Sequence, residues 1–155
     1  MRSRSASWAL ALACAAAAPA SVAAQAGWEV QLQGLGTFAE QRFLGGGAGI
    51  AVRSAGRARL ALAVNAGDRD GAFAGRGELV ATYHLSPYRR RGVSLYGGGG
   101  VTVGATADDT FEYLVLLVGI ETTPGSRTGW FVEVGVAGGV RLSAGFRIKG
   151  GARTS

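Results

Sequence analysis

Residues 130–148 read WFVEVGVAGGVRLSAGFRI, and the alternation within this stretch indicates how the chain folds. Apolar side chains stand at every second position on both sides of a glycine pair, Gly138-Gly139. This period of two is typical of β-strands that present one apolar and one polar side. The sequence therefore predicts two antiparallel strands joined by a tight turn.

Two turn lengths fit this hairpin, and only one of them separates the charged from the apolar side chains. A two-residue turn at Gly138-Gly139 places Glu133 on the same side as Leu142. A three-residue turn over 137–139 instead places Glu133 opposite Ser143. Because a slip of one residue would invert every side chain, we expect the three-residue turn. Its register pairs Val136 with Val140, Val134 with Leu142, and Trp130 with Phe146.

The same period of two recurs from Gly27 onward, interrupted by turn-forming residues. The expected strands cover residues 28–38, 44–53, 57–66, 76–85, 93–103, 111–120, 130–136 and 140–148. Residues 68–75, between the third and fourth strands, are expected to form a polar loop. Eight is an even number, as a closed single-chain antiparallel membrane barrel requires. The predicted fold class is all-β, an eight-stranded antiparallel up-and-down transmembrane β-barrel.

The composition agrees with a β-rich chain and excludes several classes of protein. Of 155 residues, 27 are glycine, 48% are hydrophobic and 17% are charged. That is too apolar for a disordered chain, and the glycines follow no collagen-like period of three. A glycine inside a helix costs about 0.5–1 kcal/mol relative to alanine, so helices are disfavoured. The net charge is +6, but the basic residues are too little clustered to predict a nucleic-acid partner.

The first 26 residues have the organisation of a secretory signal peptide. Arg2 and Arg4 form a basic start, residues 8–18 are apolar and rich in alanine, and small residues allow cleavage after Ala24 or Ala26. We therefore expect a signal peptide over 1–24, export through the Sec pathway, and a barrel over 25–155. A lipoprotein signal ending at the single cysteine, Cys14, is a less favoured alternative.

Aromatic residues on the apolar side suggest that this side faces lipid. Trp28 and Phe38 share that side, ten residues apart. With a rise of about 3.3 Å per residue and a tilt of about 45°, they span about 23 Å, close to the roughly 25 Å apolar band of outer-membrane barrels. Two aromatic girdles are predicted, formed by Trp28, Tyr83, Trp130 and Phe146 near one end and by Phe38, Phe111 and Tyr113 near the other.

Charged side chains are expected to fill the interior. The polar sides of the strands carry Glu29, Arg59, Arg76, Glu78, Glu112, Glu133, Arg141 and Arg147. An eight-stranded lumen is just wide enough for side chains, so opposite charges there can pair and the lumen is too narrow for a general porin. The residues expected to pair are Arg59, Arg76, Glu78, Glu133 and Arg141.

These features resemble the small eight-stranded outer-membrane β-barrel families of Gram-negative-type bacteria. The most specific similarity is at residues 141–148, where Arg141, Phe146 and Ile148 resemble a C-terminal sorting signal. Ser143 stands where glycine is usual, and seven residues follow Ile148. The resemblance implies an outer-membrane monomer with both termini periplasmic. Its implied partners are membrane lipid or lipopolysaccharide, and the barrel-assembly machinery acting on the C-terminal strand.

The resemblance favours a non-catalytic structural or lipid- and envelope-interacting role, with two alternatives. Lipid A deacylases in these families carry a His-x-Ser pair, and His84-Leu85-Ser86 has that spacing. However, Pro87 follows where those enzymes have asparagine, and no acidic residue lies between His84 and Asp108 to orient the imidazole. The second alternative is a soluble periplasmic β-barrel that binds an apolar ligand.

The remaining motifs have structural interpretations. The glycine runs 45–47 and 97–100 lack the Lys-Ser/Thr pair of a phosphate-binding loop, so we expect close backbone approach or kinks at a tightly curved wall. The run Arg89–Arg91 is expected to be a solvated turn, with anionic headgroups as the alternative ligand. One histidine and no cysteine after cleavage supply no metal-ligand set, and no cofactor is expected.

Overall fold

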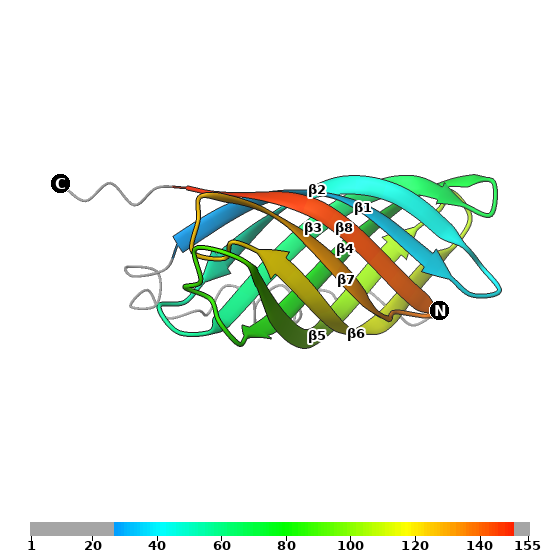
Figure 1. Cartoon of the computed structure of the whole chain (residues 1–155). Coiled ribbons are helices and arrows are strands. Elements are labelled where there is room, and N and C mark those ends of the chain that lie inside the picture. Colours follow the sequence, from blue (N-terminus) through cyan, green and yellow to red (C-terminus); the bar gives the residue numbers. More distant parts are fainter. Residues whose placement is uncertain (1–26, 151–155) are drawn as a thin grey trace, which may run out of the picture.

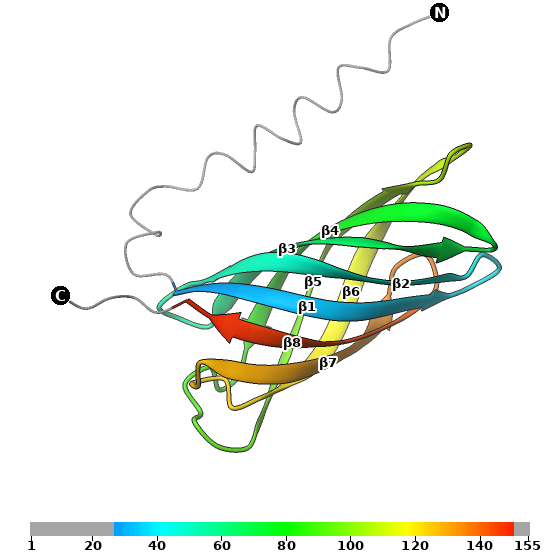
Figure 2. The ribbon, with the colours of Figure 1, turned by 90° about the horizontal axis from the view of Figure 1, so that it is seen from above.

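The computed structural model describes residues 27–150, which form one closed antiparallel β-barrel (Figure 1). Each strand pairs with the next along the chain, and β1 pairs with β8 to close the sheet (Figure 2). The predicted eight-stranded up-and-down barrel is confirmed. The strands are β1 (Gly27–Phe38), β2 (Phe43–Arg53), β3 (Ala58–Arg69), β4 (Ala72–His84), β5 (Val93–Ala105), β6 (Thr110–Thr122), β7 (Thr128–Val136) and β8 (Val140–Lys149).

The expected signal peptide, its cleavage sites at Ala24 and Ala26, and Cys14 lie outside the described residues. Within residues 27–150 there is no helix long and apolar enough to cross a membrane.

The connections between strands fall into two sets, one at each end of the barrel. The terminal end, where β1 begins and β8 ends, carries the connections 54–57, 85–92 and 123–127. The mouth end carries the connections 39–42, 70–71, 106–109 and 137–139. The mouth-end connections are all short, and the longest connection, 85–92, is at the terminal end.

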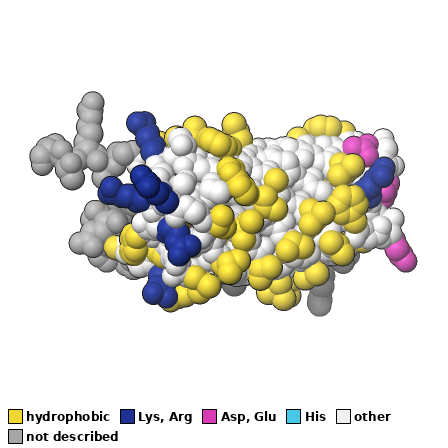
Figure 3. Space-filling view, in the orientation of Figure 1, with side chains coloured by type: hydrophobic (Ala, Val, Ile, Leu, Met, Phe, Trp, Pro, Cys, Tyr) yellow, Lys and Arg dark blue, Asp and Glu magenta, His cyan; other side chains and the backbone are white. Residues whose placement is uncertain are grey.

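Side chains alternate between the interior and the outer surface along the strands. Large apolar side chains such as Leu32 and Leu116 are 61% and 63% exposed on the outside. Charged side chains such as Glu29 and Arg141 are 0% and 1% exposed in the interior. Figure 3 shows hydrophobic side chains spread over the outer wall between two charged ends. This distribution is the reverse of that in a soluble barrel, whose interior is apolar.

The register predicted for the last hairpin is confirmed. Val136 pairs with Val140, Trp130 pairs with Phe146, and Glu133 lies opposite Ser143. The three-residue connection 137–139 closes the hairpin, with positive φ values of 70° at Gly138 and 158° at Gly139.

The loop predicted over residues 68–75 is wrong, because β3 and β4 continue into it. Only Asp70 and Gly71 lie outside the strands, with φ values of 51° and 88°. Two successive residues in the left-handed region are characteristic of a two-residue type I′ turn, which Asp-Gly favours. The Asp68 carboxylate also accepts a hydrogen bond from the Gly71 backbone N–H (3.1 Å). Local turn chemistry therefore extends the hairpin where a count of polar residues predicted a loop.

The expected orientation of the sixth strand is also wrong. Phe111 is 7% exposed and faces the interior with Tyr113, so neither belongs to an outer girdle, and Glu112 faces outward. Both sides of this strand are apolar, so alternation alone left its orientation open. The orientation observed places Glu121 inside among arginines and places the Phe111 ring over Gly104 of β5.

The inward-facing glycines of β2 and β5 lie close to the backbone of the neighbouring strand, as predicted. A Cβ at Gly100 would overlap the Leu79 carbonyl oxygen of β4. By contrast, a Cβ at Gly77 would lie 3.9 Å from the nearest side-chain atom of Val103, an ordinary contact.

Substituting Gly100 is therefore expected to destabilise the barrel. Gly100→Ala forces β4 and β5 apart and should lower the free energy of unfolding by about 1–3 kcal/mol, the usual cost of overpacking. Gly77→Ala, the matched control, should leave it within about 0.5 kcal/mol. Urea titration of both refolded variants in detergent micelles measures the difference. Equal midpoints would show that the wall has room for a side chain at residue 100.

Candidate functional site

The interior of the terminal half contains an ion-pair network that we call the terminal cluster: Glu29, Arg53, Arg59, His84, Glu121 and Arg147. Glu29 accepts hydrogen bonds from Arg53 Nε (3.0 Å) and Arg59 Nε (2.8 Å). Arg53 also donates from both Nη atoms to Glu121 (3.2 and 3.1 Å). Because β1, β2 and β3 are adjacent, their inward-facing positions bring Glu29 and the two arginines together.

Glu121 of β6 joins the far wall to this network. Its carboxylate lies 3.0 Å from Arg147 Nε and 2.7 Å from His84 Nδ1, besides the two bonds from Arg53. Glu121 is 2% exposed, so its charge is balanced almost entirely by protein groups. Three strands thus converge on one carboxylate, which makes it a structural centre of the lumen.

A second network, the central cluster, lies nearer the mouth and contains Arg76, Glu78, Glu133 and Arg141. Glu78 accepts from Arg76 Nη2 and Arg141 Nη2, both at 2.8 Å. Arg141 Nη1 donates to Glu133 (2.8 Å), and the Tyr96 hydroxyl donates to the same carboxylate group (3.0 Å). Tyr96 also stacks on the His84 ring with centroids 4.5 Å apart, and so links the two clusters.

Four of the five residues expected to pair in the lumen therefore lie together in the central cluster. The fifth, Arg59, lies in the terminal cluster, where it contacts Glu29 and donates to Gln31 (2.5 Å). Six further residues complete the networks but were missing from the expected pairs: Glu29, Arg53, His84, Tyr96, Glu121 and Arg147. Arg53 and Tyr96 stand at the alternate positions that form the polar side of their strands, so the sequence pattern could have placed them in the lumen. Glu121 carried no clear signal, because the orientation of β6 was ambiguous.

The two clusters leave little free space between them. A cavity of about 20 Å³ lies beside Arg59, Thr82 and Glu133. That volume is enough for about one water molecule. The middle of the lumen is therefore filled by side chains.

The structure places His84 inside the lumen and Ser86 in the connection after β4, and no hydrogen bond joins their side chains. The His84 ring nitrogens instead contact Glu121 (2.7 Å) and the Thr82 hydroxyl (3.0 Å). Glu121 thus orients the imidazole, a partner not found by sequence proximity. The arrangement resembles a hydroxyl–imidazole–carboxylate relay, but His84 is 1% exposed and the neighbouring cavity is too small for a lipid chain.

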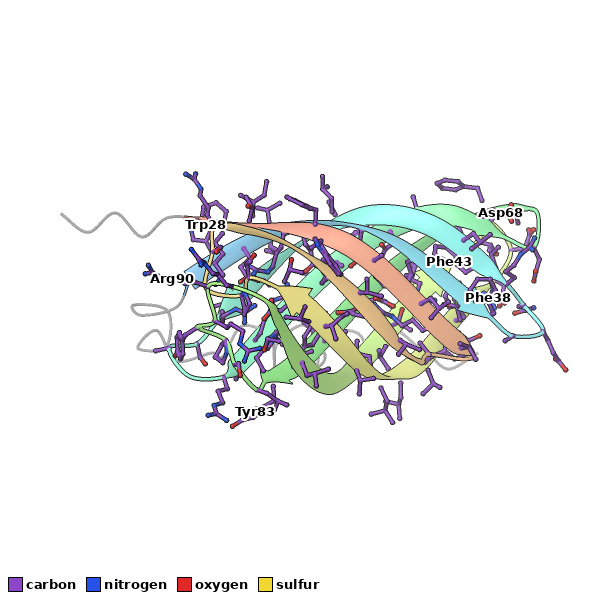
Figure 4. The ribbon with its side chains drawn as sticks, in the orientation of Figure 1. Trp28, Phe38, Phe43, Asp68, Tyr83 and Arg90 are labelled. Carbon is purple, nitrogen blue, oxygen red and sulfur yellow. The ribbon has the colours of Figure 1, made fainter. Side chains whose placement is uncertain are left out.

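Five of the seven aromatic residues expected in girdles lie on the outer surface. Trp28 and Tyr83 are at the terminal end and Phe38 is at the mouth end (Figure 4). Trp130 and Phe146 are also exposed on the outside, 45% and 49% respectively. Phe73, within the wrongly predicted loop, is 77% exposed near the start of β4 and joins Phe38 at the mouth end.

The residues of the expected sorting signal lie on both sides of β8. Phe146 and Ile148 are exposed on the outer surface, whereas Arg141 is buried in the central cluster. In the folded barrel this strand is paired on both edges, with β7 and with β1.

The two ends of the barrel have opposite charge. The three terminal-end connections carry five arginines and no acidic residue; the arginines are Arg57, Arg89, Arg90, Arg91 and Arg127. The mouth-end connections carry Glu40, Asp70, Asp108 and Asp109, with Arg42 as their one basic residue. Figure 3 shows basic side chains gathered at the terminal end and acidic side chains at the other.

Among residues 27–150, no group of three or more His, Cys, Asp or Glu side chains is arranged to hold a metal ion.

Comparison with known proteins identifies the fold. No family model and no curated protein sequence matches the chain. Similar solved structures include Neisserial surface protein A (14% identity, TM-score 0.59, covering 81% of this chain and 97% of that one). The N-terminal β-barrel domain of Pseudomonas aeruginosa OprF is 16% identical (TM-score 0.55, 78% and 95%). The outer membrane protein OprG from the same organism is 13% identical (TM-score 0.55, 83% and 98%). The expected resemblance to small outer-membrane barrels is thus confirmed for the fold.

Proposed function

We propose that the chain is a non-catalytic integral outer-membrane β-barrel protein with a structural or lipid- and envelope-interacting role. The observation that carries this proposal is the reversed distribution of polarity, with a charged interior and an apolar outer wall. Large apolar side chains on all eight strands are exposed, including Leu32, Leu62, Leu116 and Leu142. Burying such a surface in acyl chains stabilises it, whereas leaving it in water does not.

Both ends of the barrel fit a bilayer. Trp28, Tyr83 and Trp130 at the terminal end, and Phe38 and Phe73 at the mouth end, match the aromatic girdles of membrane barrels. The five terminal-end arginines suit anionic headgroups, which makes membrane lipid the proposed partner. We place the terminal end in the periplasm, and we infer export through Sec and assembly as a monomer by machinery that recognises β8.

The filled lumen supports a role without transport through the barrel or catalysis inside it. The terminal and central clusters occupy the interior with paired side chains, and the cavity between them has a volume sufficient for about one water molecule. His84 is enclosed by Thr82, Tyr96 and Glu121, so a lipid substrate has no access to its ring.

Fractionation combined with heat-modifiability tests this proposal. The protein is expected in the outer-membrane fraction, resistant to carbonate extraction, and its gel mobility should change after boiling because a closed barrel resists detergent. A soluble periplasmic protein and a known inner-membrane protein serve as fractionation controls. Recovery in the soluble periplasmic fraction would favour the ligand-binding alternative. Loss of an acyl chain from lipid A on expression, abolished by His84→Ala, would overturn the non-catalytic role.

A further inference from the structure

The mouth end of the barrel contains a cavity that the ion-pair networks do not fill. Its volume is about 380 Å³, within the size range of small-molecule sites, about 300–1,000 Å³. Phe43, Arg69, Arg76, Phe111 and Tyr113 line it, together with residues 39–41, of which Glu40 is acidic. It opens beside the short mouth-end connections, and Figure 4 shows Phe43 at this end.

Arg69 is the charged group in this cavity that has a buried nitrogen without a hydrogen-bond partner. Its side chain is 9% exposed, and its Nη1 atom has no hydrogen-bond partner. Its Nη2 atom donates to the Gln41 side chain and to the Tyr113 hydroxyl (3.4 Å). The nearest carboxylate oxygen to Nη1 is that of Asp109, at 4.0 Å, on a side chain that is 65% exposed. A buried guanidinium with a free N–H edge favours an acceptor, and a carboxylate matches its planar geometry.

The other walls of the cavity favour an apolar group next to that carboxylate. The Phe111 ring lies beneath the Arg69 guanidinium, 3.9 Å from its carbon to the ring centroid, and Phe43 lines the same cavity. Arg76 adds a second positive charge at the floor, but all three of its nitrogens already donate, to Thr102, Thr37 and Glu78. Arg76 therefore contributes positive potential from a side chain held by other residues, while Arg69 has a nitrogen without any partner.

We propose that the mouth cavity binds a small carboxylate that carries an apolar or aromatic body. The carboxylate accepts from Arg69 Nη1 and lies near the Tyr113 hydroxyl, and the apolar body contacts Phe43 and Phe111. Asp109 competes with the ligand for the same guanidinium edge and turns toward solvent when the ligand binds. The site depends on the geometry of the mouth and not on the membrane around the barrel, so it stands or falls separately from the proposed function.

Titration with benzoate tests the site in the full-length mature barrel refolded in micelles. The amide NMR signals of residues 39–41, 69 and 111–113 are expected to shift saturably. Benzamide, which has the same shape without the charge, should bind at least about tenfold more weakly than benzoate. Benzylammonium should not bind. Arg69→Gln should weaken benzoate about tenfold or more, whereas Arg42→Gln, on the exposed rim, should leave the Kd unchanged.

Asp109→Asn is expected to change the affinity for benzoate in the opposite direction. Removing the competing carboxylate should lower the Kd of benzoate by roughly threefold to fivefold. That is about the effect of one solvent-exposed charge at 4 Å from the guanidinium. This result keeps the proposal testable if Arg69→Gln does not refold. Shifts that never saturate, equal binding of benzoate and benzamide, or weaker binding by Asp109→Asn would each overturn it.

Discussion

Replacing Glu121 with alanine is expected to lower the free energy of unfolding by about 3–5 kcal/mol, the cost of breaking a buried ion pair by removing one partner. The Glu121 carboxylate contacts Arg53, Arg147 and His84 within 3.2 Å, and all four side chains are nearly inaccessible. Without it, the buried guanidinium groups of Arg53 and Arg147 share with Arg59 the single remaining carboxylate of the cluster, Glu29. Urea titration of the barrel in micelles, followed by gel mobility without boiling, measures the loss.

Glu112 provides the matched control on the same strand. It is exposed on the outer side, so Glu112→Ala should change the free energy of unfolding by no more than about 0.5 kcal/mol. Glu121→Gln should fall between the two, because it keeps the shape and some hydrogen bonds but removes the charge. Equal losses for Glu112→Ala and Glu121→Ala would show that the terminal cluster contributes no net stability.

An arginine in place of Leu116 is expected to cost about 2–4 kcal/mol when the barrel is folded in lipid vesicles. Leu116 is at the middle of β6 and 63% exposed on the outer wall, so an inserted barrel places it near the bilayer centre. The physical cause is the transfer of a charged side chain into hydrocarbon. Comparison of the unfolding free energies of the wild type and Leu116→Arg, measured by urea titration in the same vesicles, gives the value.

Leu85→Arg separates lipid exposure from a general effect of the substitution. Leu85 is 54% exposed in the connection after β4, at the terminal end, where the interface reduces the cost to about 0–1 kcal/mol. In a soluble barrel both leucines would face water, and neither change would exceed about 0.5 kcal/mol. Similar small values at both positions would therefore contradict the membrane location.

The sequence alone determined the architecture and most of the strand orientations. In β7 and β8, Glu133 and Arg141 must lie on the side opposite the valines and leucines, and only one turn length allows it. That constraint is local, because alternation and turn length are properties of neighbouring residues. The two-residue turn at Asp70-Gly71 is also determined by neighbouring residues, because Asp-Gly favours this turn type. The polarity of residues 68–75 nevertheless led to the prediction of a loop.

The tertiary structure alone decided the orientation of β6 and the partners in the lumen. Both sides of β6 are apolar, so alternation does not say which side faces inward. That choice was fixed by pairing with β5, where Phe111 lies over Gly104, and by the arginines that surround Glu121. Residues as distant as Arg53 and Glu121 meet only because the barrel closes. The mouth cavity depends on the same closure, since Phe43, Arg69 and Phe111 come from different strands. Alternation places a side chain inside, but the register around the closed wall selects the charge or ring that it meets.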